Sequence, residues 1–252
     1  MTLRCVGVTA MAAGKALLAR TDLRLSPGRV TAILGPNGAG KSTLLALLSG
    51  ERRPDQGQVL LDDTDIARIA APALALRRAV MAQEGAVSFD FLVREVVELG
   101  RYPHRSRPAV DEGALVAQAM ADADVAHLAP RVFNTLSGGE KARVHLARVL
   151  AQSTRWLLLD EPTAALDLAH QHQVLGLLRR QAHAQGRGVA LVLHDLNLAL
   201  RYADEAVLLA DAALQAAGPV REVLSPARVL AVWGVRGTVA QAADGTPQYL
   251  FG

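Results

Sequence analysis

A glycine-rich segment between a predicted buried strand and a predicted helix constrains this chain more than any other feature. It reads Gly35-Pro-Asn-Gly-Ala-Gly-Lys41-Ser42 and follows the apolar run Val30–Leu34. Glycines let the backbone curl so that successive N–H groups face one anion, and a helix beginning at Lys41 aims its positive dipole end at the same place. This eight-position pattern predicts a phosphate-binding loop at the carboxyl end of a strand, followed by a helix that Gly50 ends.

The loop also gives roles to individual side chains. Lys41 would reach the β- and γ-phosphates of a nucleotide, and the Ser42 hydroxyl would bind Mg²⁺. The predicted nucleotide-contacting residues here are Gly35, Pro36, Asn37, Gly38, Ala39, Gly40, Lys41, Ser42 and Thr43. The alternative is a glycine-rich turn that binds nothing, but such a turn gives no packing reason for a Lys-Ser pair at the start of a helix.

Short apolar runs alternate with helix-period stretches along most of the chain, which indicates a mostly parallel sheet covered by helices. The predicted buried strands are residues 30–34, 80–82, 156–159 and 189–193. Residues 1–30 and 58–62 have the pattern of antiparallel strands. In the tail, a helix should start at Ser225-Pro226, with Pro at its first position, and Asp244-Gly245 should form a hairpin turn.

Between residues 91 and 134 the strand signal disappears and helical spacing takes its place. Residues 92–101 and 111–128 read as helices. We therefore predict an α/β fold in which residues 1–90 and 139–252 form the core, with an antiparallel β part, and residues 91–138 form a helical insertion. The loop between the two helices carries Arg101, His104, Arg105 and Arg107, which could contact anionic lipid or a partner, although a solvated loop is the simpler interpretation.

Composition excludes several classes of protein. The 252 residues carry a net charge of +3 and show no basic cluster, so nucleic acid is not an expected partner. The single cysteine, Cys5, allows no disulfide framework and is expected to be an ordinary core or strand residue. No signal peptide is visible, and no apolar run approaches the ~20 residues that a membrane span requires, so we do not expect the chain to cross a membrane on its own.

Two carboxylates follow the predicted strand Trp156–Leu159. Ligands bind at the carboxyl ends of strands in α/β sheets, where the phosphate-binding loop also lies. Asp160 would hold Mg²⁺ through its water shell, and Glu161 would polarise the attacking water. The alternative, a strand that ends in a solvated acidic turn, is common by itself and is disfavoured by the nearby loop.

The segment Leu136-Ser137-Gly138-Gly139-Glu140 suggests a second phosphate binder. Locally it reads as a capping box, with Ser137 as N-cap and Glu140 three positions on. A capping box does not explain two glycines in the first turn, which cost helix stability and expose backbone N–H groups. Exposed amides at a helix N-terminus bind anions. Two phosphate-binding elements in a chain with one glycine-rich loop suggest a shared nucleotide.

These motifs, in this order, resemble the ATPases of the ABC-transporter family over nearly the whole chain. The resemblance implies a P-loop NTPase (RecA-like) core that binds ATP and Mg²⁺. It also assigns Gln83 as the glutamine that contacts Mg²⁺ and water, His194 as the histidine at the γ-phosphate, and Asp167, in Ala164-Ala-Leu-Asp167, to the loop that communicates across the dimer. Taken alone, Gln83 could be any polar strand end and His194 a structural histidine.

The same resemblance implies a head-to-tail homodimer with two ATP molecules at its interface. Each ATP would lie between the loop of one copy and Ser137, Gly138 and Gly139 of the other. Binding would close the dimer, and hydrolysis at Glu161 would open it. The inserted helices would carry the groove for a membrane permease, with Phe89 and Phe91 either as exposed anchors at its edge or buried beneath it.

Non-catalytic segments resemble the subgroup that serves haem, iron-siderophore and cobalamin importers. This resemblance is carried by Gly100-Arg-Tyr-Pro-His104 and His194-Asp-Leu-Asn-Leu-Ala199. Two further segments look most like haem-importer subunits: Asp167-Leu-Ala-His-Gln-His172 and the stretch Leu146–Gln152. The resemblance implies two permease subunits, a periplasmic substrate-binding protein reached through the permease, and a location at the cytoplasmic face of the bacterial inner membrane. Iron-siderophore or cobalamin import, a soluble ABC-type ATPase of nucleic-acid or ribosome function, and a P-loop kinase are the alternatives.

Two details qualify the resemblance. His170 and His172 could suggest a haem ligand pair, but residues two apart on a helix point to different faces, so we do not expect them to share a ligand. The family usually stacks an aromatic side chain on adenine near position 10, which is Ala10 here, and residues 1–30 contain no Phe, Tyr or Trp. Nucleotide preference is therefore predicted to be loose, with measurable GTP hydrolysis.

Overall fold

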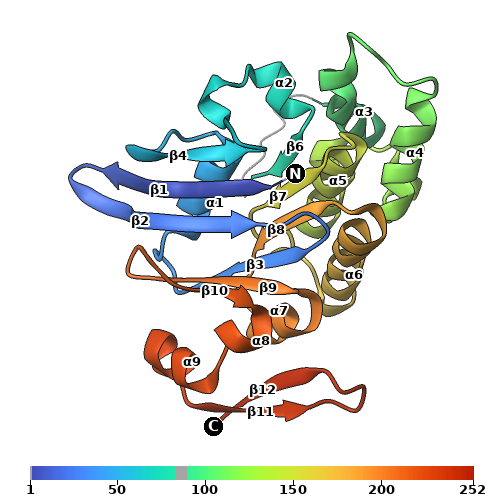
Figure 1. The fold of residues 1–252 in the computed structure, drawn as a ribbon. Coiled ribbons are helices and arrows are strands. Elements are labelled where there is room, and N and C mark those ends of the chain that lie inside the picture. Colours follow the sequence, from blue (N-terminus) through green and yellow to red (C-terminus); the bar gives the residue numbers. More distant parts are fainter. Residues whose placement is uncertain (1, 83–89) are drawn as a thin grey trace.

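A six-stranded sheet is the centre of the fold in the computed structural model, which describes residues 2–82 and 90–252 (Figure 1). Its strand order is β10-β9-β3-β8-β7-β6. The strands are β3 (Val30–Leu34), β6 (Arg78–Met81), β7 (Trp156–Leu159), β8 (Gly188–Val192), β9 (Glu205–Ala210) and β10 (Ala213–Pro219). All neighbours from β9 to β6 pair in parallel, and β10 is antiparallel to β9. The predicted, mostly parallel sheet is confirmed.

The parallel strands are buried on both faces. Every residue of β3, β7 and β8 is buried, which is why these strands are continuous apolar runs in the sequence. β3 and β7 have the predicted limits, and β8 begins and ends one residue earlier than predicted. Since parallel strands share one direction, the residues that follow β3, β7 and β8 meet at one edge of the sheet. The candidate site forms at that edge.

A second, antiparallel sheet packs over one face of the helix that follows the phosphate-binding loop. It has the order β2-β1-β4-β5, and its strands are β1 (Leu3–Ala12), β2 (Lys15–Leu25), β4 (Gln56–Leu61) and β5 (Thr64–Asp65). Helix α1 (Lys41–Ser49) has the predicted limits and lies between the two sheets, with its leucines in an apolar cluster formed with both. Cys5 lies in this cluster, where burial raises the pKa of its thiol to about 12. It is a core residue, as predicted.

Helices cover the other face of the large sheet. They are α3 (Val93–Glu98), α4 (Glu112–Asp122), α5 (Gly138–Ala151), α6 (Leu168–Gln185) and α7 (Leu196–Tyr202), and α2 (Ala71–Ala75) precedes β6. A second apolar cluster joins the sheet to α3, α4, α5, α6 and α7. The inserted helices α3 and α4 lie together at one end of the molecule, packed on α5 (Figure 1). The predicted fold class is therefore confirmed, while the limits 91 and 138 stay predictions.

The two predicted helices of the insertion are shorter than the sequence pattern indicated. The first ends at Glu98 and continues as the 3-10 helix Leu99–His104, because Pro103 cannot donate within an α-helix. The second ends at Asp122, because the backbone turns into the left-handed region at Asp124 (φ 54°) before the 3-10 helix Ala126–Leu128. Phe91 is partly buried against the apolar cluster, whereas Phe89 lies outside the described residues.

The interpretation of residues 101–108 as a solvated loop was wrong for two of its basic residues. Arg101 is 9% exposed, and its guanidinium donates to Ala151 O at 2.7 Å and pairs with Glu112. His104 Nε2 lies 2.9 Å from Gln152 O. Sequence pattern alone could not find these contacts, because their partners Ala151 and Gln152 lie about fifty positions along the chain. Arg101 fastens the insertion to the end of α5.

Replacing Arg101 with Ala should lower the free energy of unfolding by about 1–3 kcal/mol, because it removes a buried charge-assisted hydrogen bond and an ion pair. Hydrogen bonds from Arg101 and from the Ala109 N–H lower the pKa of Glu112 from 4.5 to about 2. A depressed carboxyl pKa stabilises the fold above the unfolded pKa and ceases to do so as the pH falls through the folded one. Urea unfolding should therefore show the largest difference from wild type above pH 4.5, shrinking toward pH 2.

The exposed pair Arg94–Glu98 on α3 provides the matched control. Arg94→Ala should change the free energy of unfolding by no more than about 0.5 kcal/mol, as expected for a surface ion pair. An equally small effect of both substitutions would show that Arg101 does not fasten the insertion.

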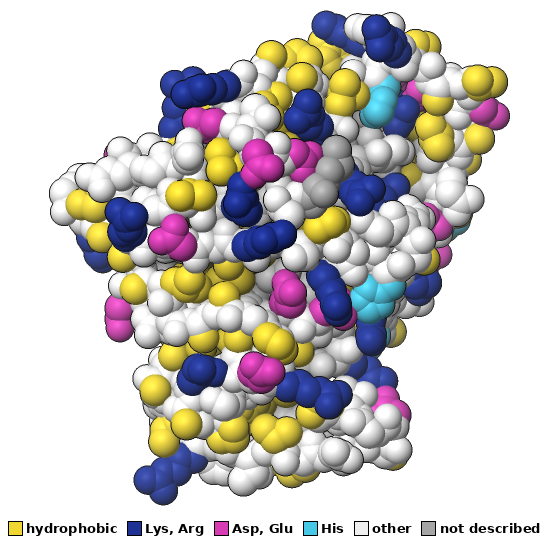
Figure 2. Space-filling view, viewed as in Figure 1, with side chains coloured by type: hydrophobic (Ala, Val, Ile, Leu, Met, Phe, Trp, Pro, Cys, Tyr) yellow, Lys and Arg dark blue, Asp and Glu magenta, His cyan; other side chains and the backbone are white. Residues whose placement is uncertain are grey.

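The chain ends in α8 (Val220–Val223), α9 (Pro226–Trp233) and a hairpin of β11 (Gly237–Gln241) and β12 (Pro247–Phe251). The predicted helix start at Ser225-Pro226 and the turn at Asp244-Gly245 are both confirmed. This C-terminal part lies at the end of the molecule away from the insertion (Figure 1), and hydrophobic side chains gather on its surface (Figure 2). In the part of the chain that the structure describes, no helix is both long and apolar enough to span a bilayer.

Candidate nucleotide site

The loop at residues 35–42 has the backbone that its glycines predict. Gly35, Gly38 and Gly40 have φ values of 150°, 78° and 98°, in the region that side chains disfavour. A Cβ on Gly35 would lie 2.1 Å from Leu209 O, and one on Gly40 would lie 2.5 Å from Leu17 O. Neighbouring strands therefore press on the loop from two sides, and only glycine fits at these two positions. No side chain caps the N-terminus of α1 at Gly40, which leaves its first N–H groups for an anion.

Lys41 lies inside this loop. Its Nζ donates to Gly35 O and Pro36 O, each at 2.9 Å, and the residue is 6% exposed. Burial lowers the pKa of the Lys41 ammonium, and the carboxylates of Glu161 and Asp160 oppose this shift. A cation held by two carbonyls at the positive end of a helix is placed to meet the phosphates of a nucleotide. Asn37, Gly38 and Ser42 are exposed at the rim of the same loop.

Asp160 lies beside Ser42, the last residue of the loop. Asp160 follows β7, is 8% exposed, and has one carboxylate oxygen, Oδ1, without a hydrogen-bond partner among the described residues. Burial raises the pKa of Asp160, and the Ser42 hydroxyl opposes this shift. A buried carboxylate oxygen without a partner, next to a hydroxyl and to a phosphate site, fits a Mg²⁺ ion that keeps its other ligands from water and nucleotide.

Glu161 and His194 meet at the mouth of the site. His194 Nε2 lies 2.7 Å from Glu161 Oε1. Glu161 adopts a left-handed backbone conformation (φ 49°), which is uncommon for a residue with a side chain and which marks functional turns. Both residues were predicted to lie at strand ends, but the contact between them was not predicted. Since β7 and β8 are parallel neighbours, residues just beyond them must lie side by side, and this register was the available signal.

The Ser137 segment forms the predicted capping box. The Ser137 hydroxyl accepts from Glu140 N, and Ser137 N donates to Glu140 Oε2 at 2.8 Å. The bond from Ser137 N and a further one from the Ser137 hydroxyl to Glu140 Oε2, at 2.9 Å, lower the pKa of the Glu140 carboxyl. A Cβ on Gly138 would meet Ala165 Cβ at 3.7 Å, and one on Gly139 would meet Ala165 O at 3.1 Å. In the described parts of this chain, no hydrogen bond or ion pair joins Ser137, Gly138 or Gly139 to residues 35–42.

A sequence profile described as "ABC transporter" matches residues 18–164, which include the loop, the Ser137 segment and both acidic residues. The chain belongs to the ABC transporter family. It is 45% identical over 250 residues to the hemin import ATP-binding protein HmuV of Bordetella pertussis, covering 95% of this chain and 94% of that protein. The chain is also similar to a solved structure described as "An inward-facing conformation of a putative metal-chelate type ABC transporter". The two share 29% identity and a TM-score of 0.84, over 99% of this chain and 97% of the other.

Another solved member of the ABC transporter family is dimeric. It is the ATP-binding cassette MJ0796 in a post-hydrolysis state bound to ADP and Pi. Identity is 25% and the TM-score 0.77, with 87% of this chain and 99% of that chain covered. The fold described above is therefore that of an ABC ATPase cassette.

The sequence also singled out Gln83, Asp167 and the histidines 170 and 172. Gln83 lies outside the described residues. Asp167 caps α6, where its carboxylate accepts from His170 N and pairs with His170 Nδ1 at 2.7 Å; these bonds lower its pKa. His172 Nδ1 instead lies 2.6 Å from the Tyr202 hydroxyl. The two histidines thus have separate partners, in keeping with the expectation that they share no ligand.

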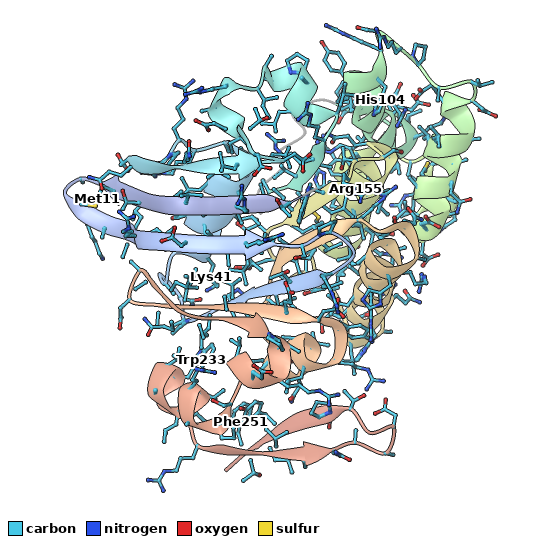
Figure 3. The ribbon with its side chains drawn as sticks, in the orientation of Figure 1. Met11, Lys41, His104, Arg155, Trp233 and Phe251 are labelled. Atoms are coloured by element: carbon cyan, nitrogen blue, oxygen red, sulfur yellow. The ribbon has the colours of Figure 1, made fainter. Side chains whose placement is uncertain are left out.

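The expected adenine position of this ABC cassette offers no ring. Ala10 is 0% exposed within β1, so it presents no surface to a base. The next residue, Met11, is 42% exposed at the end of β1, on the same hairpin that covers the loop of Lys41 (Figure 3). A thioether gives a base a softer and less oriented contact than an aromatic ring does.

Proposed function

We propose that this chain is the ATP-hydrolysing subunit of an importer that moves haem through a membrane permease. The observation that carries the catalytic part is the Glu161–His194 pair at the mouth of the Lys41 loop. The haem part is supported by 45% identity, over nearly the full length of both chains, to a protein named for hemin import.

The residues divide the hydrolysis of ATP among them. Lys41 and the N–H groups of residues 38–43 would hold the β- and γ-phosphates, as a built anion site at a helix N-terminus. Ser42, Asp160 and Gln83 would hold Mg²⁺, which supplies charge neutralisation on the phosphates. Glu161 would orient water and accept its proton as the water oxygen attacks the γ-phosphorus. The bond to the β–γ bridging oxygen then breaks, which leaves ADP and phosphate. His194 would orient Glu161 and contact the γ-phosphate.

One copy supplies only part of this site. Among the residues that the structure describes, the second predicted phosphate binder, Ser137 with Gly138 and Gly139, has no hydrogen bond or ion pair to its own loop, and both glycines lie next to residue 165. We infer a head-to-tail homodimer in which each ATP lies between Lys41 of one copy and Ser137–Gly139 of the other, with Asp167 near the contact. The relative bound to ADP and Pi is dimeric, which supports the dimer.

The membrane partners follow from the role in import. We infer two permease subunits, contacted through the inserted helices, and a periplasmic binding protein that acts through the permease. The cassette would then sit at the cytoplasmic face of the bacterial inner membrane.

The decisive experiment isolates the native complex from membranes and measures its ATPase activity with candidate cargo-loaded binding proteins. Stimulation by the haem-loaded binding protein is expected. Stimulation only by an iron-siderophore or cobalamin complex would move the cargo to that alternative. Recovery of the cassette free of membranes and bound to nucleic acid would reject import altogether.

GTP should be hydrolysed at a rate comparable with ATP, because residues 1–30 contain no aromatic side chain that would hold a base in one orientation for base-specific hydrogen bonds. Steady-state kcat/KM for both nucleotides, measured on the full chain, checks this. We expect the ratio to stay within about tenfold, less than the discrimination that hydrogen bonding to a substrate provides. A strong preference for ATP would reveal a base-specific contact elsewhere in the site.

A further inference from the structure

The C-terminal hairpin is fastened to the helix that follows His194. Helix α7 begins directly after His194-Asp195, and Asp195 caps it by accepting from Asn197 N and Leu198 N. Strand β12 lies along α7. The contact between them is therefore made in the first turn of the helix, two or three residues from the imidazole that meets Glu161.

The Asn197 side chain makes this contact by hydrogen bonding to the backbone of β12, as a neighbouring strand would. The Asn197 carboxamide accepts from Tyr249 N at 2.6 Å and donates to Tyr249 O at 3.3 Å. It thus satisfies both main-chain polar groups of one residue of β12. A pair of bonds from a planar amide fixes distance and orientation together, which a single bond or an apolar contact does not.

Tyr249 is itself held in place. It is 3% exposed, its hydroxyl donates to Leu224 O at 2.5 Å, and its ring stacks on Phe251. The far end of the hairpin is fixed by the ion pair of Asp244 with Arg201, at the opposite end of α7. These contacts hold the hairpin in place, so that the bonds from Asn197 to Tyr249 can fix the position of the start of α7.

A pocket lies beside His194, and the C-terminal part of the chain forms its other wall. This pocket of 370 Å³ lies between His194, Leu196 and Asn197 on one side and Val229, Trp233 and Phe251 on the other. Figure 3 shows Trp233 and Phe251 within the C-terminal part that forms this wall. Val229 and Trp233 belong to α9, and Phe251 belongs to the hairpin.

We propose that the C-terminal hairpin is a positioning element of the active site, and that Asn197 is the positioning residue through which it holds His194 against Glu161. The proposal rests on the role of His194 in hydrolysis proposed above. The Asn197 side chain bonds to the main chain of Tyr249, and its effect on His194 would pass through the first turn of α7.

The test is a double-mutant cycle on ATP hydrolysis by the full chain. Asn197→Ala should lower kcat about tenfold, as small misplacements of catalytic groups do, and leave KM for ATP within about twofold. In a His194→Ala background the same substitution should change kcat by less than about twofold, because the group it positions is gone. Equal factors in both backgrounds, or an unchanged kcat in the single variant, would overturn the proposal.

Two further variants separate positioning from stability. Arg201→Gln removes the ion pair with Asp244, which is the contact between α7 and the hairpin that lies away from His194. It should lower the thermal midpoint while kcat stays near wild type, because the bonds between Asn197 and Tyr249 remain. A tenfold loss of kcat would overturn the assignment of Asn197 as the positioning residue. Tyr249→Phe removes the bond to Leu224 and alters no atom of α7. It should lower kcat modestly in the wild-type background alone, which keeps the test decisive if Asn197→Ala does not fold.

Failure of the proposed function gives a different result. If the wild-type chain does not hydrolyse ATP, or if His194→Ala has full activity, the role of His194 is wrong and the cycle has no meaning. If both of these behave as proposed and Asn197→Ala equals wild type, only the positioning role is rejected.

Discussion

Glu161→Gln should reduce ATP turnover by about 10²–10⁴-fold, the contribution of a positioned general base, while ATP binding is retained. The amide has nearly the same shape as the carboxylate and can still bond to His194 Nε2, so the geometry of the turn is preserved. It cannot accept a proton from water at neutral pH. ATP should therefore bind, close the dimer and remain unhydrolysed. Single-turnover hydrolysis, with size-exclusion chromatography in ATP and Mg²⁺, measures both parts.

Two controls accompany this variant. Glu222→Gln removes an exposed carboxylate away from the site and should leave turnover unchanged. Asp160→Asn should also lose activity, but with weaker ATP and Mg²⁺ binding, because its partnerless oxygen is the group proposed to face the ion. Hydrolysis at a near-normal rate in Glu161→Gln, with Asp160→Asn inactive, would transfer the role of base to another residue.

The sequence predicts those parts of the fold and site that depend on local pattern. The limits of β3, β7 and α1 follow from apolar runs bounded by glycines and acids, since a buried parallel strand and a glycine-ended helix leave signals within a few residues. The capping box at Ser137 is equally local. The loop around Lys41 is predicted by its three glycines, because their backbone conformations are ones that residues with a side chain rarely adopt.

The sequence does not reveal contacts between residues far apart in the chain. Arg101 reads as a loop residue, and only the fold shows it buried against Ala151. No sequence pattern predicts that Asn197 bonds to a residue 52 positions away, because its amide bonds to main-chain groups that nearly every residue possesses. The Glu161–His194 pair is an intermediate case, since knowing that β7 and β8 are neighbours suffices to predict it.

Mixing two inactive variants should restore ATP hydrolysis if each site is shared between copies. Lys41→Ala removes the ammonium from the loop and leaves Ser137–Gly139 intact. Gly138→Asp does the converse: a Cβ at Gly138 meets only Ala165 Cβ at 3.7 Å, an ordinary contact, so the residue fits and places a carboxylate where phosphate would bind. An acidic residue in the first turn also suits a helix N-terminus, so α5 should stay folded. Each variant alone should be almost inactive.

A mixed dimer contains one site with both defects and one with neither. Equal co-expression should therefore recover up to about a quarter of wild-type activity, since half of the dimers are mixed and each has one intact site. Gly138→Ala serves as the matched control: it removes the glycine without the charge and should be markedly less impaired than Gly138→Asp. If the mixture stays as inactive as its components although mixed dimers form, each copy must complete its own site. Ser137–Gly139 would then have to reach its own loop by a rearrangement, because among the described residues this segment has no hydrogen bond or ion pair to that loop, and both glycines lie next to residue 165.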